Sequence, residues 1–323
     1  MPFAGRSVSV GIAKESSRGT WVDAAYWIPV SSLDFDDKFD VIENDASYGV
    51  LNDVTGAAMS KKWAEGDLEG PIGDTSIGLV LKSLFGTENK TTTSGESAVY
   101  DHAFTLQTSA QHPSLSVTKK DSVRTFGFTN AMVTGLEINA ALDSFATAKI
   151  SLRGQAGATQ TSTPSYTTEN LFHRTGITFL RSTSLAGLDS GTAVKVKSCK
   201  LTFNPNVVDD DVLGTAAPND FLNTEFRAEG EIELLYEADT YHDFVKDQTA
   251  TYYRLKLTNP TLLGVASYPT LQFDFAKVAS KEWSRKDELG NIVSQTVKFV
   301  AKYNTTDALA VQVLLRNTLS SVY

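Results

Sequence analysis

The sequence predicts a mainly β chain made of two tandem β-domains, each with one short helix. A six-residue motif at 64–69, AEGDLE, returns 164 residues later at 228–233 as AEGEIE. Much of the remaining chain alternates apolar and polar residues, which is the period-two pattern of half-buried strands. A length of 323 residues fits two domains of about 150 residues each.

The repeated motif has the pattern of a strand with one charged face. With a period of two, three carboxylates of each copy share one face, and the small or aliphatic residues between them share the other. Because unpaired buried charge is costly, each motif predicts a strand whose acidic face meets water. The two acidic strips are Glu65, Asp67 and Glu69, and Glu229, Glu231 and Glu233.

The first half is predicted to contain a polar N-terminal arm, several strands and one helix. Residues 1–25 form the arm, and a linker is expected at 156–171, where the sequence loses its periodicity and contains a proline. Asp74 or Thr75 is the expected N-cap of a helix that ends at Gly86. The predicted strands are 33–41, 64–69, 101–107, 114–119, 124–129, 132–142 and 146–153, and residues 87–98 are expected to form a loop.

The second half is predicted to repeat this order. The first domain is therefore expected at 26–155 and the second at 172–323. A hairpin at 279–292 is longer than its counterpart in the first half. The predicted elements are a strand around 199–204, an acidic loop at 208–223, the acidic strand at 228–236, a helix at 239–245, and strands at 251–258, 270–278, 293–303 and 308–315.

The composition and motifs give no support for an enzyme. A net charge of −9 argues against tight binding to phosphate backbones. Cys199 is the single cysteine, so it is expected to be a small buried apolar residue and not part of a disulfide or metal site. The four histidines lack zinc-site spacing, the acidic runs at 34–37 and 209–211 lack calcium-loop spacing, and no phosphate loop or nucleophile elbow is present. We predict no catalytic residue, no cofactor and no metal.

Several segments resemble tail tube proteins of long-tailed, siphovirus-like bacteriophages. The resemblance runs over most of 10–155 and, more loosely, over 198–316. It is carried by the segments 11–20 (GIAKESSRGT), 63–70 (WAEGDLEG), 78–86 (GLVLKSLFG), 111–117 (QHPSLSV) and 131–138 (AMVTGLEI).

This resemblance implies sandwich-like domains of two antiparallel sheets flanked by a short helix. It also implies rings of six domains, stacked into a hollow tube through which the genome leaves the capsid. With two domains per chain, three chains would complete a ring of pseudo-sixfold symmetry, and the alternative is a hexamer of chains. A tape-measure protein and tail-terminator proteins are the implied partners. DNA would pass without specific binding, no membrane contact is expected, and the chain would be made in the host cytoplasm and reside in the virion tail.

From the resemblance we expect the charged segments to form two surfaces, one that lines the lumen and one that contacts neighbouring rings. The two acidic strips are expected to line the lumen, where carboxylates would repel DNA phosphates, with Asp34, Asp36 and Asp40 beside them. The alternative is that these carboxylates pair with basic residues of a neighbouring subunit or face outward. The arm, the loop 208–223 and the hairpin 279–292 are expected to contact stacked rings through Lys14, Arg18, Asp209, Asp210, Asp211, Arg285, Lys286, Asp287 and Glu288.

Two other functions fit the same sequence pattern. The first is a carbohydrate-binding or adhesion β-sandwich of a virion tail tip, in which exposed aromatic residues would contact sugars; the four tryptophans are the residues to inspect. The second is the inner tube of a contractile tail or secretion system, which shares the expected fold.

Overall fold

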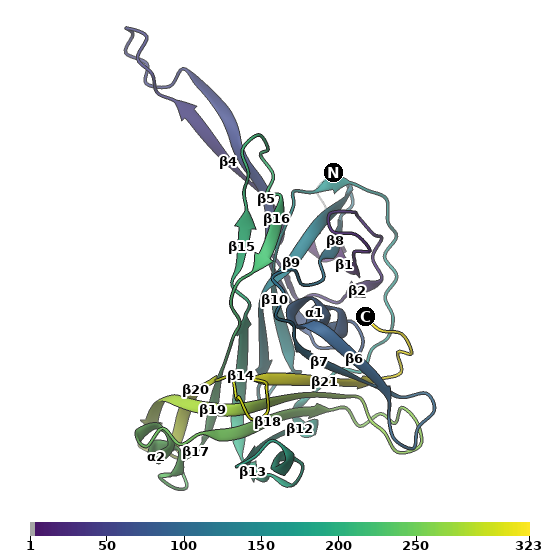
Figure 1. Ribbon diagram of the computed structural model, residues 1–323, viewed down its shortest axis with the longest axis vertical. Coiled ribbons are helices and arrows are strands. Elements are labelled where there is room, and N and C mark those ends of the chain that lie inside the picture. The colour runs from purple at the N-terminus through teal and green to yellow at the C-terminus, as the bar shows by residue number, and fades with distance from the viewer. Residues whose placement is uncertain (1–3) are drawn as a thin grey trace.

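The computed structural model describes residues 4–323, so residues 1–3 of the predicted arm lie outside the described part. Nineteen strands are connected by pairing into one extended sheet system, and two more form a separate hairpin. The molecule is elongated, with the hairpin formed by β4 and β5 projecting from one end (Figure 1). The chain is therefore mainly β with two short helices, as the sequence predicts.

Seven strands from the first half of the chain pair in an unbroken antiparallel series, which we call the N-terminal strand set. In order of pairing they are β2 (Tyr26–Ile28), β1 (Ser9–Lys14), β8 (Leu115–Lys120), β9 (Thr125–Ala140), β10 (Thr147–Gly154), β5 (Gly56–Pro71) and β4 (Asp36–Asn44).

Seven strands from the second half pair in the same order and form the C-terminal strand set. They are β13 (Thr192–Val194), β12 (Ile177–Ser182), β18 (Thr251–Thr258), β19 (Thr270–Lys286), β20 (Ser294–Ala301), β17 (Arg227–Leu235) and β14 (Val196–Asn204). The two repeated motifs occupy the same place, since β5 and β17 are each the sixth strand.

The irregularities of the two sets also correspond. The pairing of β8 with β9 shifts register beside Asn130, and the pairing of β18 with β19 shifts beside Lys277. Asn130 has a φ of 52° and Lys277 a φ of 55°, an uncommon left-handed conformation for residues other than glycine. Both strand sets therefore have a β-bulge at the same place. A shared strand order does not require a shared bulge, so the bulge is a further similarity between the two sets.

Within the described residues one ladder joins the two sets directly, and a further series of strands extends the C-terminal set. Strand β14 pairs with β9 from Cys199 opposite Ala140 to Phe203 opposite Leu136. Strand β21 (Val311–Asn317) pairs with β19 on one side and with β7 (Tyr100–Leu106) on the other, and β6 (Gly86–Thr92) then pairs with β7. The short strands β3 (Ser32–Leu33) and β11 (Ala158–Thr159) extend β5 and β9, whereas β15 (Val207–Asp210) and β16 (Asp220–Asn223) pair with each other.

One continuous apolar core runs through both sets and includes the helix α1 (Ile77–Phe85). Stacked and edge-to-face rings connect its parts, such as Phe203 with Phe85 at 5.9 Å and with Phe273 at 5.6 Å between centroids. Helix α2 (Thr240–Lys246) is more exposed and packs on β19. Cys199 is fully enclosed in this core, where burial raises the pKa of its thiol to about 12.

The structure differs from the predicted elements in several places. Residues 87–98 were expected as a loop, but their first part is strand β6. The predicted strands 124–129 and 132–142 form the single strand β9, because the bulge bends the chain without ending its pairing. The polar arm contains β1, and the acidic loop contains the β15–β16 hairpin. Neither Asp74 nor Thr75 caps α1; the backbone N–H of Ser76 instead donates to the carboxylate of Glu169 at 3.1 Å.

Candidate functional site: one polar face of the joined sheet

Both acidic strips lie on the same face of a continuous part of the sheet. Directly opposite residues of paired strands share a face, and one such row runs from β5 to β17 through β10, β9 and β14. The row consists of Glu69, Lys149, Glu137, Thr202 and Glu229. The ladder between β9 and β14 therefore converts two separate acidic strands into one surface, which we call the polar face.

The two motif glycines hold this sheet together in different ways. Gly66 has a φ of 153°, and a Cβ there would lie 1.6 Å from the backbone oxygen of Asp34. The backbone between β3 and β4 thus reaches β5 only because residue 66 has no side chain. At Gly230 a Cβ would instead meet the ring of Phe299, 2.1 Å away. Each glycine admits a close neighbour that helps to fix the strand that carries the carboxylates.

Two carboxylates of the first strip are paired with basic residues of the adjacent strand β10. Lys149 Nζ lies 2.8 Å from an oxygen of Asp67, and Arg153 lies 2.9 Å from an oxygen of Glu65. Burial alone would raise the pKa of Asp67, but hydrogen bonds from Lys149 and Ser151 outweigh it and hold that pKa below its ordinary value. Glu69 makes no ion pair with another described residue. The first strip is therefore only partly free to act as negative charge.

The second strip is less neutralised. Glu229 accepts from Arg227 at 2.7 Å and from Lys281 at 3.0 Å, and these contacts, led by the hydrogen bond from Arg227, lower its pKa. Glu231 and Glu233 have no ion pair within the described residues. Glu231 stands opposite Lys298, but Lys298 pairs with Glu282 at 2.7 Å.

Most basic residues on the polar face are engaged by carboxylates of the same chain, whereas Lys38, which lines the same groove as Asp34 and Glu65, makes no ion pair with another described residue. Among the engaged residues, Lys200 forms an ion pair with Glu137, with 2.8 Å between its Nζ and a carboxylate oxygen. Glu69, Glu231 and Glu233 remain as unpaired acids among the described residues, so the face keeps an excess of negative charge. Glu65, Asp67 and Glu229 pair with basic residues of the same chain, and the predicted alternative of pairing with a neighbouring subunit stays a prediction.

The three aspartates placed beside the strips lie at or near the edge strand β4. Asp34 lies just before β4 and, with Glu65, Asp67 and Glu137, lines an open polar groove. Asp36 is exposed and forms a 2.7 Å ion pair with Lys119 of β8. Asp40 is exposed further along β4, where only β5 pairs with it. The structure brings Asp34 to the polar face and places Asp40 on the projecting hairpin.

Two residues of the predicted ring-contact set are engaged inside the chain. Arg18 binds Asp220 through two nitrogens, at 2.5 and 3.0 Å, and also donates to the carbonyl of His112. Lys14 donates to the carbonyl of Tyr323 at 2.5 Å. These contacts pin the first strand and its following loop to the body of the protein.

The acidic run 209–211 braces the projecting hairpin. Asp209 binds both Lys61 of β5, at 2.6 Å, and Arg153 of β10, at 2.7 Å, and Asp211 also binds Lys61. Asp210 bonds to Asn219 across the β15–β16 hairpin. The remaining four residues, Arg285, Lys286, Asp287 and Glu288, lie exposed at the far end of β19 and its turn, where they pair locally.

Sequence analysis missed the most exposed apolar segment of the molecule, the β4–β5 hairpin between residues 36 and 63. Figure 1 shows it standing clear of the sheet system, with β15 and β16 beside its base. Leu51 at its tip is fully exposed. The signal was present in the sequence, because apolar residues alternate there, but the alternation was taken to bury one face. The exposed apolar side chains are Phe39, Val41, Ile42, Tyr48, Val50, Leu51, Val54 and Met59.

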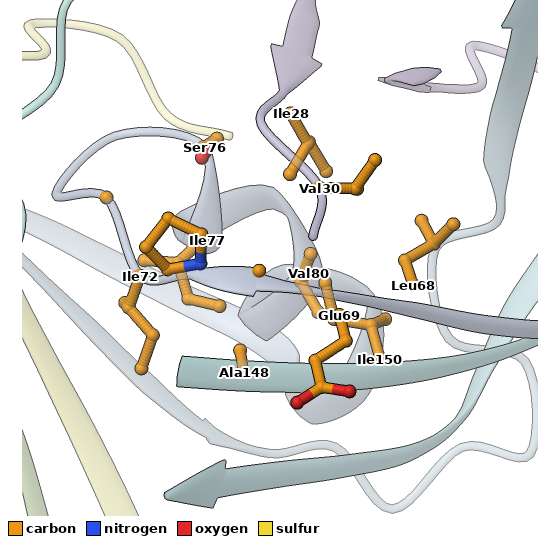
Figure 2. A pocket seen from close by; sticks show the side chains of 13 residues that line it. Ile28, Val30, Leu68, Glu69, Ile72, Ser76, Ile77, Val80, Ala148 and Ile150 are labelled. Carbon is orange, nitrogen blue, oxygen red and sulfur yellow. The ribbon is translucent and has the colours of Figure 1, made fainter. Parts of the chain in front are cut away.

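The larger hollows among the described residues, such as the polar groove of about 530 Å³ beside Asp34 and Glu65, are open to solvent. The crevice in Figure 2, between β5, β10 and α1, is apolar and has a volume of only about 20 Å³, the space of a single water. Figure 2 also shows the carboxylate of Glu69 directed away from Ile28 and Val30, on the opposite side of its strand from Leu68. No group of His, Cys, Asp and Glu within residues 4–323 is arranged to hold a metal ion.

The aromatic and apolar surfaces also fit structural roles. Trp27 is buried, and Trp21, Trp63 and Trp283 are half-buried. Trp63, for example, donates to Glu65 at 2.9 Å. The four tryptophans therefore do not form the exposed platform that a sugar-binding reading requires. Among the described residues, no helix has the length and apolarity needed to cross a membrane.

An extended sheet with a broad charged face and a projecting apolar hairpin is typical of a structural protein that works through its surfaces. The profile of the phage tail tube protein family matches residues 5–280, and the chain belongs to this family. It is therefore a structural component of the virion tail, where tail tube proteins assemble with copies of themselves into a tube. No curated protein matches the sequence.

Proposed function

We propose that this chain is the major tail tube subunit and that its rings stack into a conduit for DNA, with the polar face turned toward the lumen. The observation that carries the proposal is the union of both acidic strips on one face of one sheet. The opposite side of the same strands belongs to the apolar core, so only the polar face is available to water.

The electrostatic state of the polar face suits a surface over which DNA slides. A free lysine or arginine would bind phosphates and release counterions, and each such contact strengthens binding steeply. Here Lys149, Lys200 and Lys298 are held by carboxylates, and Lys38 has no ion pair among the described residues. Glu231 and Glu233 carry unpaired negative charge. The face therefore repels the duplex and offers it few cationic contacts.

Reversing charge on the polar face tests this assignment. We expect Asp67→Lys and Glu231→Lys to permit tube assembly but to slow DNA ejection from virions, and added salt to reduce the defect because the new contacts are ionic. Asp143→Lys, at an exposed turn outside the polar face, is the matched control. Ejection rates equal to those of the control in both variants would show that the face lies elsewhere.

The two strand sets favour three chains per ring. We propose that each set is one tube domain, so that three chains supply six wedges of pseudo-sixfold symmetry. The shared pairing order and the shared bulges support this reading. Measuring the mass of isolated rings distinguishes the trimer from a hexamer of chains.

The exposed hairpin provides the contact between stacked rings. A patch of this many exposed apolar side chains needs a partner surface in an assembled structure, and the ion pairs of Lys61 with Asp209 and Asp211 hold its base in position. We expect Val50→Ser with Leu51→Ser to give rings that do not stack. Val265→Ser, a change at another exposed apolar residue, is the control. Long tubes from the hairpin variant would exclude this role.

A further inference from the structure

Strands β9 and β19 occupy the same place in the two strand sets, but their edges differ. The edge of β9 near its C-terminal end is paired with another strand, whereas the matching edge of β19 is open. On β9, residues 136–140 pair with β14. On β19 the corresponding end, residues 283–286, pairs with β20 on its other side, and no described strand pairs with the edge that matches the β14 edge of β9. Conversely, β14 is paired on both edges, whereas its counterpart β4 is paired only with β5.

The ladders fix which residues correspond. Ile150 lies between Leu68 and Leu136, and Val297 lies between Ile232 and Trp283. Leu68 and Ile232 are the same motif position, so Leu136 corresponds to Trp283. In the same way, Leu33 opposite Leu68 corresponds to Cys199 opposite Ile232.

We propose that β4 of one chain pairs with the open end of β19 in a second copy, in the antiparallel register that β14 adopts on β9. This inference rests on the proposed tube function, because it describes how adjacent chains of one ring join. The pairing of Phe203 with Leu136 transfers to Asp37 opposite Trp283 of the second copy. Asp36 then lies opposite Ser284, and Asp34 opposite Lys286.

The backbone of β4 is oriented for this contact. The N–H of Asp34 donates to the carbonyl of Asp67 on β5, at 2.9 Å. Alternate residues point to opposite edges, so Phe35 and Asp37 direct their N–H and C=O groups outward. In the single chain, Lys119 Nζ covers the carbonyl of Phe35 at 2.9 Å. A lysine at an unpaired edge discourages unspecific strand pairing before the correct partner arrives.

Charge supports the same register. Within the chain, the β9–β14 junction is joined by the ion pair of Lys200 with Glu137. Between chains, Asp34 replaces Lys200, and Lys286 stands directly opposite it. In the junction inside the chain Asn139 stands at this place opposite Lys200, so the ion pair of Asp34 with Lys286 would be a new contact between chains. Lys286 and Arg285 are exposed in the single chain, where they pair with Glu288 and Asp287 of the adjacent turn. An acidic strand that binds this end of β19 would compete with those exposed pairs for the two cations.

Cysteine pairs test the register directly. Asp36 and Ser284 would form a non-hydrogen-bonded pair, with Cα atoms about 4.5 Å apart, which suits a disulfide. We expect Asp36→Cys with Ser284→Cys to give covalently closed rings under mild oxidation. Thr202→Cys with Glu137→Cys is the positive control, since it places the same pair at the junction inside the chain. The buried Cys199 does not interfere.

A shifted pair serves as the negative control. Lys38→Cys with Ser284→Cys would separate the Cα atoms by about 8 Å, too far for a disulfide. Cross-linking of Lys38→Cys equal to that of Asp36→Cys would overturn the register. Tubes that form without any cross-link in the Asp36 pair, while the internal control closes, would overturn the strand pairing but leave the tube function standing. Failure of the unmodified chain to form rings or tubes would instead remove the proposed function.

A charge exchange gives a second readout that needs no disulfide. We expect Asp34→Lys to raise the protein concentration required for assembly about fivefold, a change typical of one exposed ion pair. Combining it with Lys286→Asp restores the attraction and should restore assembly. If the double variant assembles no better than Asp34→Lys alone, the two residues do not face each other.

Discussion

Replacing Asp220 by Asn should weaken the fold where the first strand, the bulge of β9 and the β15–β16 hairpin meet. The Asp220 carboxylate accepts from Arg18, from Gln111 at 2.9 Å and from Asn130 at 3.1 Å. Its side chain is 12% exposed and that of Arg18 is 24% exposed. The substitution keeps the shape but leaves the guanidinium without a counter-charge.

The expected cost follows from this burial. Removing one partner of a fully buried pair costs about 3–5 kcal/mol, and the partial exposure of Arg18 places this case near the lower end, about 3 kcal/mol. For a chain of this length that free energy corresponds to a fall in melting temperature of about 4 °C. Thermal and urea unfolding of dispersed chains measure it, with Arg18→Met and the double variant completing a mutant cycle.

The dependence on pH sharpens the test. Burial opposes ionisation of Asp220, but the hydrogen bond from Arg18 and the other donors prevail and hold its pKa below the ordinary value. A carboxyl with a lowered folded-state pKa stabilises the fold above the unfolded value of about 3.9, and this stabilisation is lost as the pH falls through the folded-state value. The variant should therefore differ from the natural chain at pH 7 and begin to converge with it only below about pH 4. If the free energy of unfolding falls by less than about 0.5 kcal/mol at pH 7, which is the size of effect that ordinary surface substitutions have, the buried ion pair does not stabilise the fold as argued.

Three further outcomes follow from single residues. Gly66→Ala should prevent folding of the β4 base and Gly230→Ala should cost less, because the first meets backbone and the second a side chain; equal losses of secondary structure by circular dichroism would contradict this. Cys199, with its pKa near 12, should resist alkylation until the chain unfolds, and rapid labelling of the native protein would show that the core opens. Burial raises the pKa of Glu169 despite its bonds to Ser76, so this group makes stability fall as the pH rises from about 4. Glu169→Gln should remove that slope, and an unchanged urea midpoint profile between pH 4 and 6 would contradict the assignment.

Strand positions were predictable where one face of a strand is buried. The second motif strand, the alternating segment at 199–204 and both helices appear close to their predicted ranges, because burial of alternate residues imposes the period that the sequence displays. The first motif strand lies within β5, which begins eight residues before the predicted start. Burial of Cys199 was predicted on the same ground and is confirmed.

The β4–β5 hairpin could not be predicted by the same rule. Its residues alternate as they would in a half-buried strand, yet Phe39 and Met59 are exposed because no second layer covers this part of the sheet. A period of two specifies which residues share a face, and the presence of a covering layer depends on the whole fold. The ladder between β9 and β14 was equally hidden, since it joins segments that no local pattern relates.

The two copies of the motif are similar in sequence but differ in how much of their negative charge is neutralised by ion pairs. Asp67 and Glu231 occupy equivalent places in their strands, and both project from the polar face. The strand beside Asp67 offers Lys149, whose ammonium lies within hydrogen-bonding distance, whereas the lysine opposite Glu231 is held by Glu282. The duplicated motif therefore fixes the strand and the exposed face twice, while the adjacent strand decides how much of each acid's charge remains free. An electrostatic role for such a face has to be derived from its ion pairs, since a count of acids would assign both strips the same charge.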